Sequence, residues 1–303
     1  MPAPNPARAG LAAVLRRPAI VAIEIAWRWT FGAAALLLVA FVWLEFLRGI
    51  EISEAEYALT HSAPLLAVAD AIARVLAANY APLLRAAAVL LPGVALLWVI
   101  ASSVGRALTL RLLLEPARAL RYSALVGLSF FRAALALAAL GGYVAAAILA
   151  GLAAGGPERP DVGVFIAVFF PMMFLVVGLW AVLNWFLSVA PLFAVRDGDD
   201  TFAAFAHAVR WFRRRPAVFT SIGTLYGVLR LVALVVVTVL CFMLAAAVDL
   251  ISVAGVAVGI ALFSLLYFAL ADLLYVARLA AYAELMREIP VETRHAASLV
   301  ATR

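Results

Sequence analysis

Residues 231–248 read LVALVVVTVLCFMLAAAV, a stretch without a charged residue. As an α-helix it would be about 27 Å long, close to the roughly 30 Å of a bilayer's hydrocarbon core. Five further charge-free stretches occur along the chain: Trp29–Leu44, Ala86–Gly105, Ala133–Pro157, Val162–Val195 and Leu250–Ala271. The pattern predicts an all-α membrane protein with six transmembrane helices.

The composition indicates the same class. Hydrophobic residues make up 68% of the chain and charged residues 13%, about half the charge of a typical soluble domain. All 23 basic residues are arginine, which together with the abundant alanine is typical of a GC-rich bacterial genome. The arginines are spread over several short loops, so the basic balance does not indicate a nucleic-acid partner.

The arginines fall mainly on alternate sides of the charge-free stretches. The arginine-rich segments are 1–28, 106–132, 196–230 and the C-terminal tail, whereas segments 45–85 and 158–161 are acidic or balanced. Because cytoplasmic loops carry an excess of arginine and lysine, this alternation predicts that both termini are cytoplasmic. We expect a multi-pass protein of the bacterial cytoplasmic (inner) membrane.

The chain is predicted to form one six-helix domain over residues 1–303, built as three helical hairpins. The dipeptide Pro-Ala recurs at positions 18, 116 and 216, each time before a half-apolar segment that leads to a charge-free stretch. Proline suits the first turn of a helix. Residues 1–28 are interpreted as a cytoplasmic lead-in and residues 284–303 as a cytoplasmic tail.

Two segments have helical periodicity without the length of a span. Residues 64–80 are predicted to form an external amphipathic helix, and residues 199–215 a cytoplasmic one. In the second, Phe202, Phe205, Val209 and Phe212 share a face. This face either dips into the inner leaflet or packs on the helix bundle. The candidate lipid-binding residues of this segment are Arg210, Arg213, Arg214, Arg215 and Trp211, although Trp211 projects from the polar side.

No catalytic or cofactor-binding motif is recognisable. The three histidines, His61, His207 and His295, fall in an external segment, an internal segment and the tail, which argues against a metal site built on histidines. The single cysteine, Cys241, lies in an apolar stretch and is interpreted as a small core residue.

Five polar residues are candidates for a role within the membrane: Asp272, Asn184, Arg132, Arg230 and Arg278. A carboxylate at the depth of Asp272 should seek an arginine of another helix or Arg278, either in a structural ion pair or in coupling to a proton or substrate. The arginines fit interfacial snorkelling.

Helix-breaking and small residues offer further hints. Pro92 and Pro171 could interrupt the second and fourth spans, a feature that some transporters share, or simply kink them. The Gly255-x-x-x-Gly259 motif and the small-residue face that includes Gly142 permit close helix packing. Packing within the chain is favoured over dimerisation.

The sequence VAPLFAVRDG at 189–198, AFAHAVRWFRR at 204–214 and RLAAYAELMR at 278–287 resembles bacterial six-helix membrane families of poorly known function. One of them is named after the membrane domain attached to some glycerophosphodiester phosphodiesterases. The resemblance covers roughly residues 185–290. It implies an inner loop followed by an amphipathic helix, and it carries over no catalytic residue, because the phosphodiesterase domain is absent.

Two functions remain open, and a third, an intramembrane lipid enzyme, has the least support. The leading hypothesis is a non-enzymatic inner-membrane scaffold or accessory protein that contacts anionic lipid and has a membrane-protein partner or forms a homo-oligomer. The alternative is a small secondary transporter or channel that uses Asp272, Asn184 and the kinked helices. A dry, ion-paired Asp272 would favour the scaffold.

The topology is directly testable. Reporter fusions at residue 303 and within the 155–161 loop are expected to report opposite sides of the membrane. Matching signals from the two fusions would contradict the arginine-based orientation.

Overall fold

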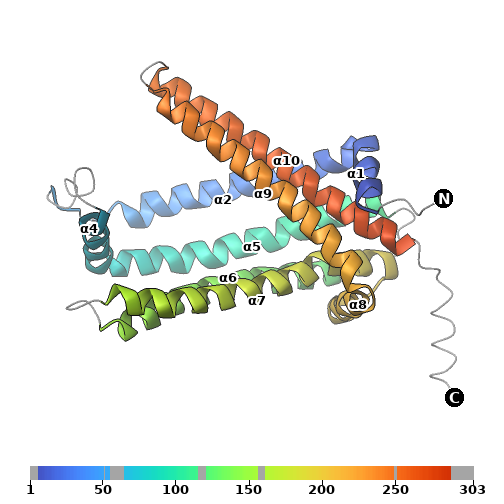
Figure 1. Ribbon diagram of the computed structural model, residues 1–303, viewed down its shortest axis with the longest axis horizontal. Helices are drawn as coiled ribbons and strands as arrows, with labels where there is room; N and C mark the ends of the chain where they lie inside the picture. Colours follow the sequence, from blue (N-terminus) through green and yellow to red (C-terminus); the bar gives the residue numbers. More distant parts are fainter. Residues whose placement is uncertain are drawn as a thin grey trace. The chain divides into compact units, whose positions relative to one another are not determined.

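The computed structural model describes residues 6–50, 52–54, 65–114, 121–155, 161–248 and 251–287. These residues form helices and contain no strand, so the all-α prediction is confirmed. The helices, in chain order, are α1 (Pro6–Arg16), α2 (Pro18–Val42), the π-helix η1 (Trp43–Leu47), α4 (Leu65–Ala78), α5 (Tyr80–Leu113), α6 (Tyr122–Ala153), α7 (Val162–Asp197), α8 (Thr201–Arg214), α9 (Pro216–Ala246) and α10 (Val253–Arg287) (Figure 1).

Six helices are long and apolar enough to cross a membrane: α2 with η1, α5, α6, α7, α9 and α10. Each contains one of the charge-free stretches or most of it, and all six are 30 to 36 residues long. The chain is therefore an integral, multi-pass membrane protein. The spans exceed the roughly 20 residues that a bilayer requires, because several helices continue into charged segments at their ends.

The predicted boundaries need some correction. Of the two alternatives for Pro92 and Pro171, an interruption is absent, since α5 and α7 continue through both prolines, and the alternative of a kink stands. The last span extends to Arg287, into the predicted tail, and residues 288–303 lie outside the described part. Of the external helix, Pro64 and the side chain of Asp70 also lie outside it.

The lead-in contains a separate helix that the sequence analysis did not predict. Helix α1 packs on α10, with Ala7, Gly10 and Val14 buried. A Cβ atom added to Gly10 would lie 2.5 Å from the backbone nitrogen of Ala281 and 2.7 Å from the carbonyl oxygen of Ala277. Only glycine lets the two helix backbones approach so closely.

The chain divides into two compact units, and four of the spanning helices contribute to both. Unit 1 comprises residues 1–27, 103–131 and 177–303, and unit 2 comprises residues 28–102 and 132–176.

Unit 2 contains α4 and parts of four spans, which contact one another in pairs. Phe31 of α2 packs edge-to-face on Trp98 of α5, with ring centroids 5.0 Å apart. Tyr143 of α6 packs in the same manner on Phe169 of α7, at 5.4 Å. Consecutive spans are thus in contact, as helical hairpins require.

The third hairpin, α9 with α10, lies in unit 1, where Figure 1 shows the two helices side by side. The Cα of Gly259 faces the side chain of Leu244 on α9. In unit 2, Gly142 similarly faces Val176 of α7. These two small residues therefore support helix packing within the chain.

Helix α8 begins after Asp200, whose carboxylate accepts a hydrogen bond of 2.8 Å from the backbone nitrogen of Ala203 and caps the helix. Trp211 is buried in unit 1, with its ring centroid 4.4 Å from that of Phe219 on α9. Phe212 packs edge-to-face on Trp185 of α7, at 5.0 Å. The placement of Trp211 on a lipid-accessible polar face was therefore wrong, because α7 and α9 cover that side of the helix.

The α1–α10 contact predicts unequal effects of two glycine substitutions. We expect Gly10→Ala to lower the free energy of unfolding by about 1–3 kcal/mol, because the new methyl group overpacks against backbone atoms. Gly227→Ala is the matched control: nothing lies within 4 Å of its added Cβ, and alanine is the better helix former. Thermal unfolding of both purified variants in detergent would measure the difference, and equal stability would contradict the close approach.

Candidate functional site

Unit 1 contains a set of buried and half-buried polar side chains, which we call the buried polar cluster. It comprises Glu24 and Trp27 of α2, Arg106 and Thr109 of α5, Ser188 of α7, and Asp272, Tyr275 and Arg278 of α10. The exposed fraction is 0% for Glu24, 4% for Arg106 and 5% for Asp272. Buried charges are expensive unless they are paired and hydrogen-bonded, so the contacts of these three residues matter most.

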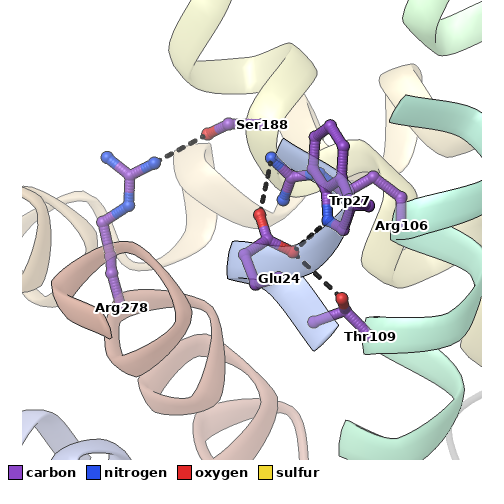
Figure 2. A network of polar contacts seen from close by, with 6 residues as sticks. All are labelled: Glu24, Trp27, Arg106, Thr109, Ser188 and Arg278. Carbon is purple, nitrogen blue, oxygen red and sulfur yellow. Dashed lines mark hydrogen bonds and ion pairs between the residues drawn. The ribbon is translucent and has the colours of Figure 1, made fainter. Parts of the chain in front are cut away.

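Glu24 is the centre of the hydrogen bonding (Figure 2). One carboxylate oxygen accepts a hydrogen bond of 2.9 Å from Nε1 of Trp27 and one of 3.0 Å from Oγ1 of Thr109. The other oxygen lies 3.6 Å from Nη2 of Arg106 in an ion pair. The carboxylate therefore has a charged partner and two neutral donors from two helices.

Local helix geometry brings these donors to one place. Glu24 and Trp27 are three residues apart on α2, as are Arg106 and Thr109 on α5, and residues at this spacing lie on the same helix face. The indole ring of Trp27 rests directly on Gly105, where a Cβ atom would overlap the ring. The glycine lets α2 and α5 approach closely enough for the Glu24–Arg106 ion pair to form.

Arg106 also connects α5 to α10. Its guanidinium carbon lies 4.3 Å from the centroid of the Tyr275 ring and 5.7 Å from that of Trp27, both within cation–π range. The charge of Asp272 also acts on Arg106, more weakly than that of Glu24. Asp272 is thus buried and near an arginine of another helix, although Arg106 was not among the candidate intramembrane residues.

Arg278 approaches the same tyrosine. Its guanidinium carbon lies 5.1 Å from the Tyr275 ring centroid, and its Nη2 donates a hydrogen bond of 3.4 Å to Oγ of Ser188 on α7 (Figure 2). Two arginines and two carboxylates therefore meet in one part of unit 1. Their formal charges cancel.

The three remaining intramembrane candidates lie in different environments. Arg132 belongs to unit 2, where its guanidinium carbon lies 5.9 Å from the Trp98 ring centroid. Arg230 is exposed on α9, and Asn184 is half-buried on α7. Of the five candidates, Asp272 and Arg278 are members of the cluster as defined above.

Three residues of the cluster were not predicted from the sequence: Glu24, Arg106 and Tyr275. Glu24 offered a usable signal, because it is the one acidic residue of segment 1–28 and lies in the apolar run between Pro18 and Trp27. A carboxylate in such a run should prompt a search for a partner. The partner, Arg106, looked like one of many cytoplasmic arginines.

Four residues after Arg278 on α10, Tyr282 is completely buried. Its hydroxyl accepts a hydrogen bond of 3.2 Å from Nε1 of Trp185 on α7 and donates one of 3.4 Å to the carbonyl oxygen of Phe219 on α9. Its ring stacks on that of Phe219, with centroids 4.8 Å apart. Tyr282 thus connects α10 to α7 and α9.

A second polar group lies between α7 and α8. One ligand atom from each of Asp197, Asp199 and His207 falls within 4.8 Å of the others, which is close enough to hold a metal ion. Asp199 contacts His207 directly, and Asp197 forms an ion pair of 3.8 Å with Nε of Arg196. The Asp199–His207 contact holds these two side chains together without a metal, and it joins His207 to carboxylates that a search for histidines alone did not consider.

The basic lipid-binding candidates behave as a group. Arg210, Arg213, Arg214 and Arg215 are all exposed at the end of α8, whereas Trp211 is 6% exposed and packs inside unit 1. Trp211 is therefore removed from the lipid-facing set, and the four arginines remain.

Comparison of the chain with protein-family models, curated proteins and solved structures finds no match. The resemblance over residues 185–290 therefore stays a prediction.

The cluster predicts large effects from neutralising its carboxylates. We expect Glu24→Gln to lower the free energy of unfolding by about 3–5 kcal/mol, because it removes the carboxylate that lies 3.6 Å from the buried Arg106 guanidinium. Asp272→Asn should destabilise less, since Arg106 retains Glu24. Arg111→Gln, an exposed change on the same helix as Arg106, is the control and should change stability by less than about 0.5 kcal/mol. Unfolding of the purified variants in mixed detergent micelles measures all three, and a Glu24→Gln effect no larger than that of the control would contradict the structural role.

Proposed function

We propose that this chain is a non-enzymatic scaffold or accessory protein of the bacterial cytoplasmic membrane. Both termini lie on the cytoplasmic side, and the protein works by presenting a rigid surface to a membrane-protein partner and to anionic lipid. What supports this proposal is its multi-pass helical structure together with the way its buried charges are used.

The observation that carries the proposal is the internal compensation of the buried polar cluster. Glu24 forms an ion pair with Arg106, and the charge of Asp272 acts on Arg106 more weakly; Arg278 lies against Tyr275 and Ser188. A site for a transported ion should carry a net charge that the bound ion neutralises. Here two carboxylates are balanced by two guanidinium groups, which suits a cluster that holds α2, α5, α7 and α10 together within unit 1.

Lipid contact is assigned to the end of α8, where four arginines are exposed. Each basic residue near an anionic membrane surface contributes about 1 kcal/mol of binding free energy. Phe205 and Phe212 pack on aromatic rings of α7, so Phe202, which is 72% exposed, is the main apolar side chain of α8 left for the lipid. The attraction should therefore be mostly electrostatic and weakened by salt.

Purification of the full chain from native membranes in mild detergent tests this function. We expect a defined protein partner and bound anionic lipid to co-purify. The combined variant Arg210→Gln, Arg213→Gln, Arg214→Gln and Arg215→Gln should lose the salt-sensitive share of that lipid, whereas the control Phe202→Ala should retain most of it.

The opposite result is equally concrete. Solute flux into proteoliposomes that requires the wild-type chain and is abolished by Asp272→Asn in a folded variant, together with the absence of a co-purifying protein, would replace the scaffold by a transporter.

A further inference from the structure

An open groove of about 420 Å³ lies between α9 and α10 in unit 1. Leu234, Cys241 and Ala245 contribute to it from α9, and Ile260, Ser264 and Phe268 from α10. These two helices form the third hairpin and lie side by side in Figure 1. Its α9 wall belongs to the charge-free stretch that predicts a membrane span, so it opens toward hydrocarbon.

The groove has the length of one membrane leaflet. Leu234, Thr238, Cys241 and Ala245 follow one another at helical spacing along one face of α9. From Leu234 to Ala245 the helix axis advances about 16 Å, compared with about 15 Å for half of the hydrocarbon core. A single acyl chain could lie along it.

The interior of the groove offers little to a polar solute. The hydroxyl of Ser264 donates a hydrogen bond of 2.8 Å to the carbonyl oxygen of Ile260 on its own helix, so its hydrogen is already used. The other named wall residues are mostly apolar. An apolar chain fits these walls better than a sugar or an ion.

A cation lies at one end of the groove. Arg230 precedes Leu234 by four residues, so it occupies the same face of α9 one turn further from the middle of the span. It is exposed and, among the described residues, forms no ion pair. On α10, Asp272 follows the groove residue Phe268 by four residues; it is buried, and its charge acts on Arg106.

We propose that Arg230 and the groove together bind one anionic phospholipid. The phosphate lies at the Arg230 guanidinium, which pairs well with phosphate oxygens, and one acyl chain lies in the groove toward Ala245. The inference rests on the membrane placement in the proposed function, but not on lipid contact by α8, and the variants used for the two sites are different.

Native mass spectrometry of the purified full chain tests this site. Dioleoylphosphatidylglycerol and dioleoylphosphatidylcholine are titrated separately onto the delipidated protein. The wild type should prefer phosphatidylglycerol, Arg230→Gln should reduce that preference about five-fold, the change expected from one basic residue, and Arg230→Lys should retain most of it. Ala245→Phe, which fills the groove from an exposed position, should lower the binding of both lipids. Val239→Phe places the same ring on an exposed position of α9 outside the groove and should change neither.

Each contrary result overturns the proposal. Unchanged phosphatidylglycerol binding in Arg230→Gln and Ala245→Phe would remove the site. Displacement of the lipid by soluble glycerol phosphate would reduce it to a phosphate site without an acyl chain. A wild-type dimer that Ala245→Phe converts to a monomer would assign the groove to a second copy of the chain. Loss of lipid only in the α8 variant would leave the proposed function standing and refute this site.

Discussion

A carboxylate that is withdrawn from both water and lipid needs an opposite charge, and in this protein that constraint falls on Glu24. Its side chain is completely buried, and Arg106 supplies the charge while Trp27 and Thr109 supply hydrogen bonds. Because Arg106 also lies against Tyr275, the requirement of one carboxylate positions parts of α2, α5 and α10 in unit 1. Removing either charge would leave the other buried without its ion-pair partner.

Small residues make these contacts possible. Gly105 lets the Trp27 ring lie on the α5 backbone, and Gly10 lets α1 lie on the α10 backbone. Such close approaches replace the hydrophobic driving force that is missing between helices in lipid, where packing and hydrogen bonds hold helices together. The polar contacts and the glycines therefore belong to one arrangement, in which the distance between the helices decides whether the ion pair can form.

Most of the fold could be predicted from the sequence, because hydropathy and charge reflect the membrane environment directly. The spans and the start of α8, with its cap at Asp200, depend on local patterns. The Glu24–Arg106 pair could not be found in this way, since 82 residues separate the partners and many arginines were available. Helix α1 has small and apolar residues at helical spacing, Ala7, Gly10 and Val14, but the helix they pack on, α10, comes from a distant part of the chain, so the segment was interpreted only as a lead-in. Trp211 was assigned to the wrong environment for the same reason: its neighbours Phe193 and Phe219 come from other helices.

The central claim is that the Glu24–Arg106 pair stabilises unit 1 as a pair rather than as two separate polar residues. A double-mutant cycle with Glu24→Gln, Arg106→Gln and the combined variant, measured by unfolding in mixed micelles, isolates this coupling. We predict that the combined variant is more stable than the sum of the two single effects implies, by at least about 1 kcal/mol. Additive effects, with a coupling energy near zero, would contradict the account.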